Sequence, residues 1–422
     1  MSELHGRHEE RRPLLEVLGP GLVTGAADDD PSGIGTYSQV GAQFGYGLAW
    51  TMLFGYPLLF AIQAICAQIG ATTGKGIAAN LRQAYPRSVL RGVVLLLVVA
   101  NVINLGADLG AMAAALALLI PGPVMVYTAL FAGLSVVLEV WLSYDRYASI
   151  LKWTTLSLFA YVAVVCVADV PIGEALRGVL VPAFTFDRDH AMALVAVFGT
   201  TISPYLFFWQ AGQEVEEQKR RHTKPLCISH RRAAGELARI RTDTLVGMGF
   251  SHLTALFVII ATAATLHAHG IREIESAAQA ADALRPIAGD LAFALFALGI
   301  IGTGMLAVPV LAGAAAYAVS ETFGWTEGLD RKPREAKAFY GTIAVAVAAG
   351  AAMNFLAIDP MKALYWAAVV NGLLAPPLMV VTMLVASNRK VMGKYTISPR
   401  LKLGGWISTA VMFVVAGLFL LS

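Results

Sequence analysis

The stretch Asp28-Asp29-Asp30-Pro31-Ser32-Gly33 lies inside an apolar run from about residue 18 to about residue 40. Carboxylates in such a run indicate a function, because each ionised group at the centre of a bilayer costs roughly 2.5 to 3.5 kcal/mol on insertion scales. Pro31 lacks a backbone donor and Gly33 turns freely, so we expect the helix to break here into two halves. Backbone carbonyls and an acid then meet at mid-membrane, which is the arrangement expected of an ion site in a transporter.

The composition of the whole chain is that of a polytopic membrane protein. Of its 422 residues, 57% are hydrophobic and only 14% are charged, whereas soluble domains have about a quarter charged. The three cysteines, Cys66, Cys166 and Cys227, show no motif spacing, so neither a disulfide nor a zinc site is predicted. The polar segment 1–13 lacks the apolar core of a secretory signal.

Apolar stretches about 20 residues long or longer predict helices that cross the membrane. They fall near residues 18–40, 48–71, 89–120, 123–143, 148–171, 191–217, 243–268, 288–320, 339–358, 362–387 and 404–421. We therefore expect an all-α polytopic membrane protein with about 11 transmembrane helices, which form a single transmembrane domain over residues 1–422.

The Lys and Arg residues gather in alternate connecting segments. If the N-terminus is cytoplasmic, all but five of the 31 Lys and Arg residues lie on the cytoplasmic side. The five outside are Arg177, Arg188, Arg272, Arg285 and Lys362. This distribution satisfies the positive-inside rule, and an odd number of spans places the C-terminus outside a plasma (inner) membrane.

The sixth apolar stretch is interrupted much as the first one is, at Ser203-Pro204 within residues 200–205. The second break lies five spans further along the chain than the first, so the second broken span starts from the opposite side of the membrane. Such a pair predicts an inverted five-plus-five repeat that binds its substrate between the broken helices. The repeats would cover about 15–171 and about 191–387, with an extra helix at about 404–421. The alternative is that both prolines only kink their helices.

The segment 218–242 is strongly basic. A basic run can bind nucleic acid, but this one lies between two spans and is better interpreted as a cytoplasmic loop near anionic lipid. We therefore expect the lipid bilayer as a partner, no nucleic acid, and no obligatory protein partner.

Several motifs resemble those of the NRAMP family of divalent metal transporters. They are Gly19-Pro20-Gly21, Asp30-Pro31, Gly41-Ala42-Gln43-Phe44-Gly45-Tyr46 with Trp50, and Ser387-Asn388-Arg389-Lys390-Val391-Met392-Gly393 after Pro376. The resemblance is scattered over nearly the whole chain and is strongest in its first fifty residues. It implies the LeuT-type fold and a divalent metal ion as the transported substrate, with no enzymatic activity and no resident cofactor.

The departures from the family pattern concern the metal ligands. Asp30 matches the family's acid, but Gly33 stands where a ligating Asn is usual, and Ser203 replaces a Met whose sulfur contacts the metal. Tyr205 and Gln210 stand where His is usual. Oxygen donors favour Mg²⁺, Ca²⁺ and Mn²⁺ over soft metals, and a cavity enlarged by these losses suits an ion that keeps its waters. The pattern resembles the NRAMP-related magnesium transporter branch, and the alternative is a cavity that no longer binds metal.

The resemblance and the breaks together suggest roles for individual residues. Asp30 would be the principal ligand beside Gly33, with carbonyls near Ala27 and Thr201 and the side chains of Ser203, Tyr205 and Gln210 completing the site. Candidates for a vestibule or relay are Asp28, Asp29, Asp108, Asn371 and Glu214. Asp28 and Asp29 would line the entry or pair with a polar group. Asp108 and Asn371 would otherwise make only interhelical hydrogen bonds, and Glu214 would otherwise belong to a solvated helix end.

Proton coupling is not required by this pattern. The usual His residues are absent, and a divalent charge gains roughly 4.6 kcal/mol per 100 mV, enough for about a thousandfold accumulation. Uncoupled, voltage-driven uptake of Mg²⁺ or Mn²⁺ is therefore the favoured interpretation. The alternatives are a LeuT-fold transporter of a small organic solute and a proton-coupled Mn²⁺/Fe²⁺ symporter.

Overall fold

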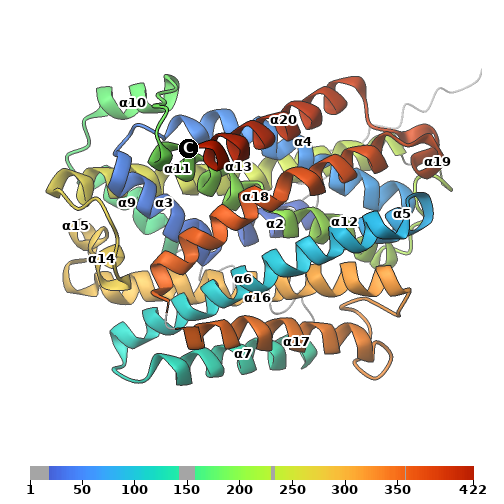
Figure 1. Ribbon diagram of the computed structural model, residues 1–422, viewed down its shortest axis with the longest axis horizontal. Coiled ribbons are helices and arrows are strands. Elements are labelled where there is room, and N and C mark those ends of the chain that lie inside the picture. The colour runs from blue at the N-terminus through green and yellow to red at the C-terminus, as the bar shows by residue number, and fades with distance from the viewer. Residues whose placement is uncertain (1–18, 142–156, 230–232, 357) are drawn as a thin grey trace, which may run out of the picture.

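The computed structural model describes residues 19–141, 157–229, 233–356 and 358–422. Within these ranges the chain is helical and contains no strand (Figure 1). The longer helices are α2 (Pro20–Asp28), α3 (Pro31–Phe44), α4 (Trp50–Thr73), α6 (Arg87–Leu119), α7 (Val124–Trp141), α9 (Phe159–Val167), α10 (Ile172–Leu180), α11 (Arg188–Thr201), α12 (Pro204–Arg220), α13 (Ala233–Thr265), α16 (Ala292–Phe323), α17 (Lys337–Met353), α18 (Pro360–Ser387) and α20 (Pro399–Leu421). Short helices in the connections include α5 (Ile77–Ala84), α14 (Ala277–Asp282), α15 (Arg285–Ala288) and α19 (Arg389–Met392).

In the described residues, 9 helical stretches are long and apolar enough to cross a membrane. They match nine of the stretches predicted from the sequence. The first predicted span does not count among them because it is divided into α2 and α3, which are 9 and 14 residues long. The fifth, predicted near 148–171, lies partly outside the described residues, and its described part contains α9.

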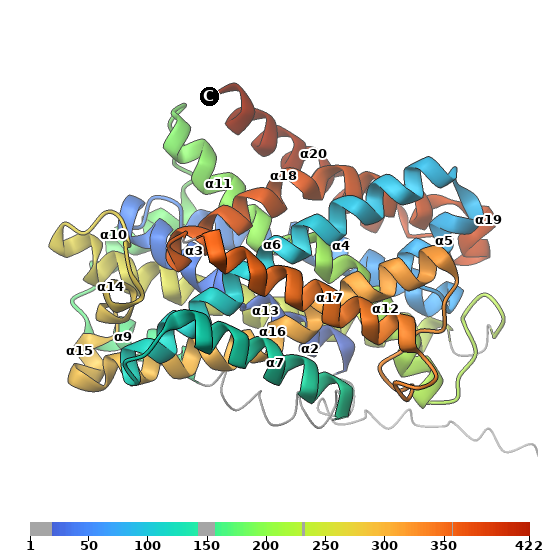
Figure 2. The same cartoon turned by 60° about the horizontal axis from the view of Figure 1, so that its bottom comes forward.

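The four halves of the two broken spans lie in the middle of the bundle. Helices α6, α16 and α18 pack around them, whereas α7 and α17 lie side by side at the edge of the molecule (Figures 1 and 2). Helices α10, α14 and α15 lie at one end of the long axis, and α5 and α19 lie at the other (Figure 1). The breaks are thus enclosed by helices that are themselves long enough to span the bilayer.

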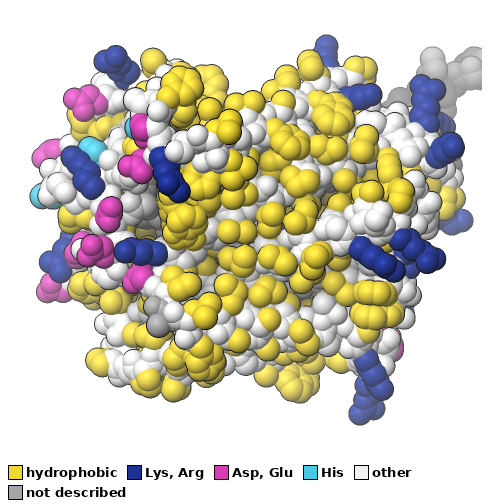
Figure 3. Space-filling view, in the orientation of Figure 1, with side chains coloured by type: hydrophobic (Ala, Val, Ile, Leu, Met, Phe, Trp, Pro, Cys, Tyr) yellow, Lys and Arg dark blue, Asp and Glu magenta, His cyan; other side chains and the backbone are white. Residues whose placement is uncertain are grey.

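The apolar and charged side chains on the surface are also arranged along the long axis of the molecule. A broad apolar band covers the middle of the face in Figure 3, and charged side chains gather at its two ends. Acidic, basic and His side chains mix at the end that carries α10 and α14, whereas mainly Lys and Arg appear at the end that carries α19. This is the surface of a protein whose long axis crosses a membrane.

Helix α2 packs backbone to backbone on α13. Gly21 and Gly25 are four residues apart and lie against α13, where a Cβ on Gly25 would be 2.2 Å from the carbonyl oxygen of Gly247. In turn, a Cβ on Gly247 would be 2.2 Å from the carbonyl oxygen of Gly21. Small residues at this spacing let membrane helices approach closely, and van der Waals contact then holds them together.

Asp243 on α13 binds the N-terminus of α2. Its carboxylate accepts hydrogen bonds from the backbone amides of Gly19, Gly21 and Leu22 at 2.9, 2.8 and 3.0 Å. These are amides that a helix cannot satisfy internally, and a negative charge is favourable at this end of the helix dipole. The glycine contact and this cap together fix α2 along α13.

Helix α18 supports the other two halves of the broken spans, α3 and α11. A Cβ on Gly199 of α11 would be 2.1 Å from the carbonyl oxygen of Ala368, and a Cβ on Gly35 of α3 would be 2.8 Å from Cδ1 of Leu364. The hydroxyl of Ser32 also donates to the carbonyl of Leu364 at 3.1 Å. The broken helices are therefore held mainly by contacts that only small residues permit.

Gly25→Ala should destabilise the protein, because the new methyl group collides with the α13 backbone and must push α2 away. Overpacking of this kind costs about 1 to 3 kcal/mol. Thermal unfolding in detergent should show a lower midpoint than wild type. Gly133→Ala is the matched control, since Gly133 lies on α7 with no atom within 4 Å of the added Cβ. Equal midpoints for the two variants would contradict the proposed packing.

Candidate functional site

Asp30 sits at the break in the first span and begins the second half-helix. Helix α2 ends at Asp28, α3 begins at Pro31, and Asp30 is the N-cap of α3. Its Oδ1 atom accepts a hydrogen bond from the amide of Gly33 at 2.6 Å. Asp at the N-cap followed by Pro is a strong helix start, so the Asp30-Pro31 pair explains both the break and the position of the carboxylate.

The break in the sixth span lies between α11, which ends at Thr201, and α12, which begins at Pro204. The hydroxyl of Ser203 donates to the carbonyls of Gly199 and Thr200 in the last turn of α11, both at 2.8 Å. The hydroxyl of Thr201 likewise donates to the carbonyl of Val197, one turn back. Both hydroxyls thus satisfy the end of α11 in this conformation.

Tyr205 joins the two breaks. Its hydroxyl is 3.0 Å from the carbonyl oxygen of Ala27 and 3.3 Å from Oδ2 of Asp30, and its side chain is buried. The phenol has one hydrogen to donate, so the two oxygens share it. Three of the residues predicted to form the metal site therefore lie together, namely Ala27, Asp30 and Tyr205.

Asn104 on α6 connects the buried acids. Its Nδ2 atom lies 3.1 Å from Oδ2 of Asp30 and 3.1 Å from Oδ2 of Asp108, while its Oδ1 atom accepts from Nδ2 of Asn371 on α18 at 2.9 Å. Asp108 also accepts from the amide of Ser32 at 3.2 Å. Two carboxylates thus face the N-terminal turn of α3, where the helix dipole favours anions.

Asp108 and Asn371 both make hydrogen bonds to groups on other helices. This is one of the two roles that the sequence suggested for them. Asn104, which the sequence shows only as a polar neighbour of Asp108, is the side chain that holds the group together. Its spacing of four residues from Asp108 on an apolar helix is the signal that points to it, because residues four apart share a helix face.

The other predicted ligands lie less centrally. The space beside Gly33 is taken by Tyr37, whose Cε2 atom would be 3.3 Å from an added Cβ, so the expected enlargement of the cavity is not seen there. Gln210 is fully buried on α12, and neither polar atom of its amide has a hydrogen-bond partner in the described structure. Asp28 and Asp29 point away from Asp30 and contact the hydroxyl of Ser251 on α13. This is the pairing with a polar group that we expected as one of their two roles.

The interpretation of Glu214 as part of a solvated helix end is wrong. Its side chain is 1% exposed, and its Oε2 atom lies 2.5 Å from Nη2 of Arg239 on α13. Arg239 also contacts Glu236 at 2.7 Å. The basic segment therefore does not remain wholly in solvent, since α13 carries Arg239 back against α12 and buries the pair.

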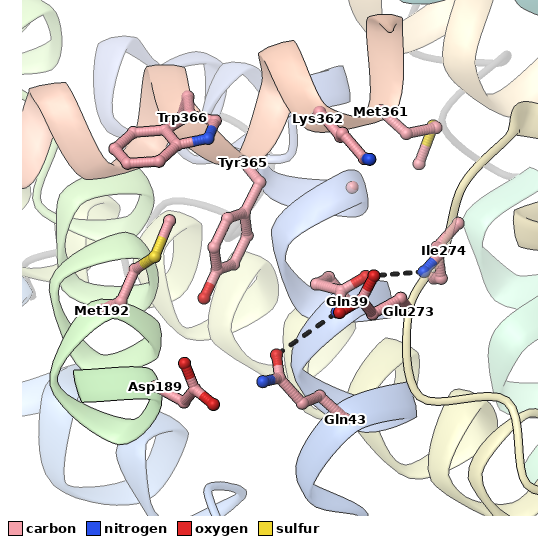
Figure 4. A pocket seen from close by; sticks show the side chains of 11 residues that line it. Gln39, Gln43, Asp189, Met192, Glu273, Ile274, Met361, Lys362, Tyr365 and Trp366 are labelled. Atoms are coloured by element: carbon pink, nitrogen blue, oxygen red, sulfur yellow. Dashed lines mark hydrogen bonds between the residues drawn. The ribbon is translucent and has the colours of Figure 1, made fainter. Parts of the chain in front are cut away.

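A cavity of about 230 Å³ lies beside α3, along Gly35, Gln39 and Gln43 (Figure 4). Its lining residues are Gly35, Gln39, Gln43, Asp189, Met192, Glu273, Ile274, Met361, Lys362, Tyr365 and Trp366. Asp189, Gln43 and Tyr365 point toward one another across it (Figure 4). The cavity reaches Gly35, against which Leu364 packs, whereas Asp30 is outside its lining and only 2% exposed.

A further acid, Asp187, lies two residues before the cavity-lining Asp189. Asp187, the N-cap of α11, accepts hydrogen bonds from Thr185 and from the amide of His190. These bonds hold the pKa of the Asp187 carboxyl at about 2, below its usual value. Asp187 is therefore ionised at neutral pH and adds negative charge near a cavity whose lining has two acids, Asp189 and Glu273, and one base, Lys362.

No three His, Cys, Asp or Glu side chains converge as a ready-made metal centre anywhere in the described ranges. A cation beside Asp30 would therefore need neutral oxygens as further ligands. The group around Asp30 offers such oxygens, namely the amide oxygen of Asn104, the phenol of Tyr205 and the carbonyl of Ala27. This set is typical of a site for a hard cation that keeps some of its waters.

Two interrupted helices that meet at a buried carboxylate define a membrane transporter of the broken-helix class. Residues 21–422 match the family model described as "Natural resistance-associated macrophage protein-like". The chain therefore belongs to the Nramp family of transporters, as the sequence motifs indicated.

Relatives and solved structures agree with this assignment. The chain is 26% identical to the divalent metal cation transporter MntH of Yersinia pestis (strain Pestoides F) over 72% of this chain and 73% of that protein. It is 25% identical to MntH of Klebsiella pneumoniae (strain 342) over 96% and 94%. The fold matches a manganese transporter of Eremococcus coleocola in complex with an aromatic bis-isothiourea compound, with a TM-score of 0.75 at 15% identity, over 99% of this chain and 87% of that one. It also matches inward-facing Mhp1, with a TM-score of 0.54 at 15% identity, over 95% and 90%.

Asn104→Ala should weaken cation binding, because it removes the amide oxygen that can serve as a neutral ligand beside Asp30. Polar contacts to a charged group contribute about 1.5 to 3 kcal/mol, so we expect roughly a tenfold to hundredfold loss of Mn²⁺ affinity by calorimetry. Asn101→Ala is the matched control, since Asn101 lies on the same helix and donates to the carbonyl of Leu311 at 2.8 Å. If both variants bound Mn²⁺ like wild type, Asn104 would have no part in the site.

Proposed function

We propose that this Nramp-family chain imports a divalent metal cation and favours hard ions, Mg²⁺ or Mn²⁺. The observation that carries the proposal is the buried Asp30 carboxylate, held at the junction of both broken helices by Asn104 and Tyr205. Relatives that align over most of this chain are named divalent metal cation transporters. Asp30 is then the principal anionic ligand.

The preference for hard ions rests on the donor atoms around Asp30. The groups that contact its carboxylate are a backbone amide, the Asn104 amide and the Tyr205 phenol. Position 203 carries a hydroxyl in place of a thioether. Oxygen donors suit Mg²⁺ and Mn²⁺, whereas sulfur would favour softer metals. These features support assignment to the magnesium-transporting branch of the family.

Binding of a cation requires a small rearrangement. Without one, Asn104 and Tyr205 offer hydrogens to the Asp30 carboxylate. A half-turn of the Asn104 amide presents its oxygen in place of its nitrogen, and the Asn371 amide, which now donates to that oxygen, turns with it to accept instead. Rotation of the Tyr205 hydroxyl turns its hydrogen away from Asp30. Thr201, Ser203 and Gln210 remain our candidates for the second break's contribution to the site, and Gln210 has a buried amide without a partner to offer to the ion or its waters.

The driving force we propose is the membrane voltage. A divalent ion gains roughly 4.6 kcal/mol per 100 mV, so no proton needs to accompany it. Tyr205 and Gln210 occupy positions where the family usually has His, which removes two groups that would carry a proton near neutral pH. Asp108 makes hydrogen bonds to Ser32 and Asn104 that explain its burial without a relay role.

The topology that goes with this function has eleven spans, a cytoplasmic N-terminus and an outer C-terminus. The two repeats of about 15–171 and 191–387 then bring α2 with α3 and α11 with α12 to the same level. The end rich in Lys and Arg in Figure 3 is cytoplasmic in this arrangement. The cavity of Figure 4 then opens outward, and its Asp189 and Glu273 draw cations toward α3.

Asp30→Asn should abolish uptake, because it removes the anionic ligand while keeping its shape. The measurement is uptake of Mg²⁺ or Mn²⁺, each supplied alone, into proteoliposomes at imposed voltages, with internal pH recorded. Wild type should show voltage-dependent uptake with no pH change, and Asp169→Asn, an exposed acid outside the site, should behave like wild type.

The same experiment separates the alternatives. Acidification that follows ion uptake would point to a proton-coupled symporter. Absence of flux for both ions, with folded protein, would favour an organic solute held in the cavity that Tyr365 and Trp366 line. Uptake that survives in Asp30→Asn would remove Asp30 from the transport site.

Ser203→Met should shift the selectivity toward softer ions. The thioether adds a sulfur ligand at the break between α11 and α12, so the ratio of Cd²⁺ to Mg²⁺ affinity should rise by about tenfold or more. Competition binding in detergent measures the ratio. Ser203→Leu, which has similar bulk and no sulfur, is the control. An equal ratio in both variants would show that position 203 does not contact the ion.

A further inference from the structure

Asp28 and Asp29 form a second acidic group that the transport site does not use. Both side chains are buried, with exposed fractions of 0% and 3%. They face α13, where the hydroxyl of Ser251 lies 2.6 Å from Oδ2 of Asp28 and 3.2 Å from Oδ1 of Asp29. Asp30, by contrast, contacts groups from α6 and α12. The unwound link therefore presents carboxylates on two different sides.

The hydrogen bonds at this second group do not balance its charge. Ser251 has a single hydrogen for two carboxylates, and Thr254 is the only further hydroxyl that donates to Asp29 in the described residues. Asp28 is the last residue of α2, so it lies at the helix end where the dipole disfavours an anion. Within the described ranges, neither carboxylate has an ion pair with Lys, Arg or His.

Two further atoms point to a missing ligand. Oδ1 of Asp28 is buried and has no hydrogen-bond partner in the described structure, and the same holds for the hydroxyl of Tyr37, whose side chain is 1% exposed. Tyr37 lies on α3, and its Cε2 atom and the backbone oxygen of Asp28 would each be 3.3 Å from a Cβ on Gly33, so its ring lies beside Asp28. Two buried oxygens without a hydrogen-bond partner thus belong to the same region, one on the last residue of α2 and one on α3. A cation bound at the Asp28 carboxylate would supply the partner that such oxygens lack, since hard cations take carboxylate and hydroxyl oxygens as ligands.

We propose that Asp28, Asp29, Ser251 and Tyr37 form a second binding site for a divalent cation, separate from the site at Asp30. Its donors are all oxygens, so it takes the same hard class of ion. One divalent ion neutralises the two carboxylates, which removes the unfavourable charge at the end of α2. The proposal deepens the proposed transport function and rests on it for the class of ion.

A cation here would act on the position of α2. Ser251 belongs to α13, the helix on which α2 packs through Gly21 and Gly25. An ion that binds Asp28 and Ser251 together therefore links the C-terminal end of α2 to α13, as Asp243 links its N-terminal end. Occupancy of the second site would hold α2 in the packed position seen here.

The test counts Mn²⁺ ions bound to the purified full chain in lipid nanodiscs. Free Mn²⁺ is measured by its electron paramagnetic resonance signal during titration. Wild type should bind two ions per chain. The double variant Asp28→Asn with Asp29→Asn should bind one, and Asp30→Asn should bind one. Ser251→Ala should keep both ions but weaken one of them by about tenfold or more.

The variants control for one another. Retention of one ion in the double variant shows that the protein is folded and that the Asp30 site is intact. Asp169→Asn, with an exposed acid, corrects for surface binding. Two bound ions in wild type should also broaden each other's spectrum, and this broadening should vanish in either variant.

Two results would overturn the second site. One is a single ion in wild type that is lost only in Asp30→Asn, and the other is unchanged binding in the double variant. Failure of the transport proposal looks different, because Asp30→Asn would then bind as many ions as wild type whatever the double variant does.

Discussion

The structure depends on the break in the first span, which lies in a region without bulk water. There the Asp30 carboxylate needs partners for its charge, and the unwound backbone needs hydrogen-bond partners. A carboxylate there is tolerated only if donors or a cation surround it, and the unwound backbone needs partners of its own. Asp30 meets both needs, since it caps α3 while Asn104 and Tyr205 reach it from α6 and α12. The neighbouring helices are arranged around this requirement.

The contacts around Asp30 also explain why the two breaks lie together. Tyr205 follows Pro204 at the start of α12, so its ring projects from the second break toward the first. Its hydroxyl bonds the carbonyl of Ala27, an oxygen near the end of α2. Each break thus supplies a group that the other lacks. Neither half-helix end would be stable in lipid alone.

Much of the fold could be predicted from sequence because it depends on local chemistry. Apolar length defines spans, and Asp30-Pro31 and Ser203-Pro204 mark helix starts whatever surrounds them. The partners could not be predicted in the same way. That Asn104 joins Asp30 to Asp108, or that Arg239 folds back onto Glu214, depends on which faces of distant helices meet. The role of a single residue such as Ser251 cannot be predicted until α13 is known to lie beside α2.

The contacts of α13 and α18 have a mechanical consequence. Helix α13 holds α2 through Asp243 and holds α12 through the ion pair of Arg239 with Glu214, so the two half-helices on the same side of the breaks share one support. The other two half-helices, α3 and α11, share α18. Helix α3 also packs closely on α13, where a Cβ on Gly41 would be 2.0 Å from Oγ1 of Thr262. Because α13 contacts α2, α3 and α12, any change in its tilt would alter the packing of three of the four half-helices that meet beside Asp30.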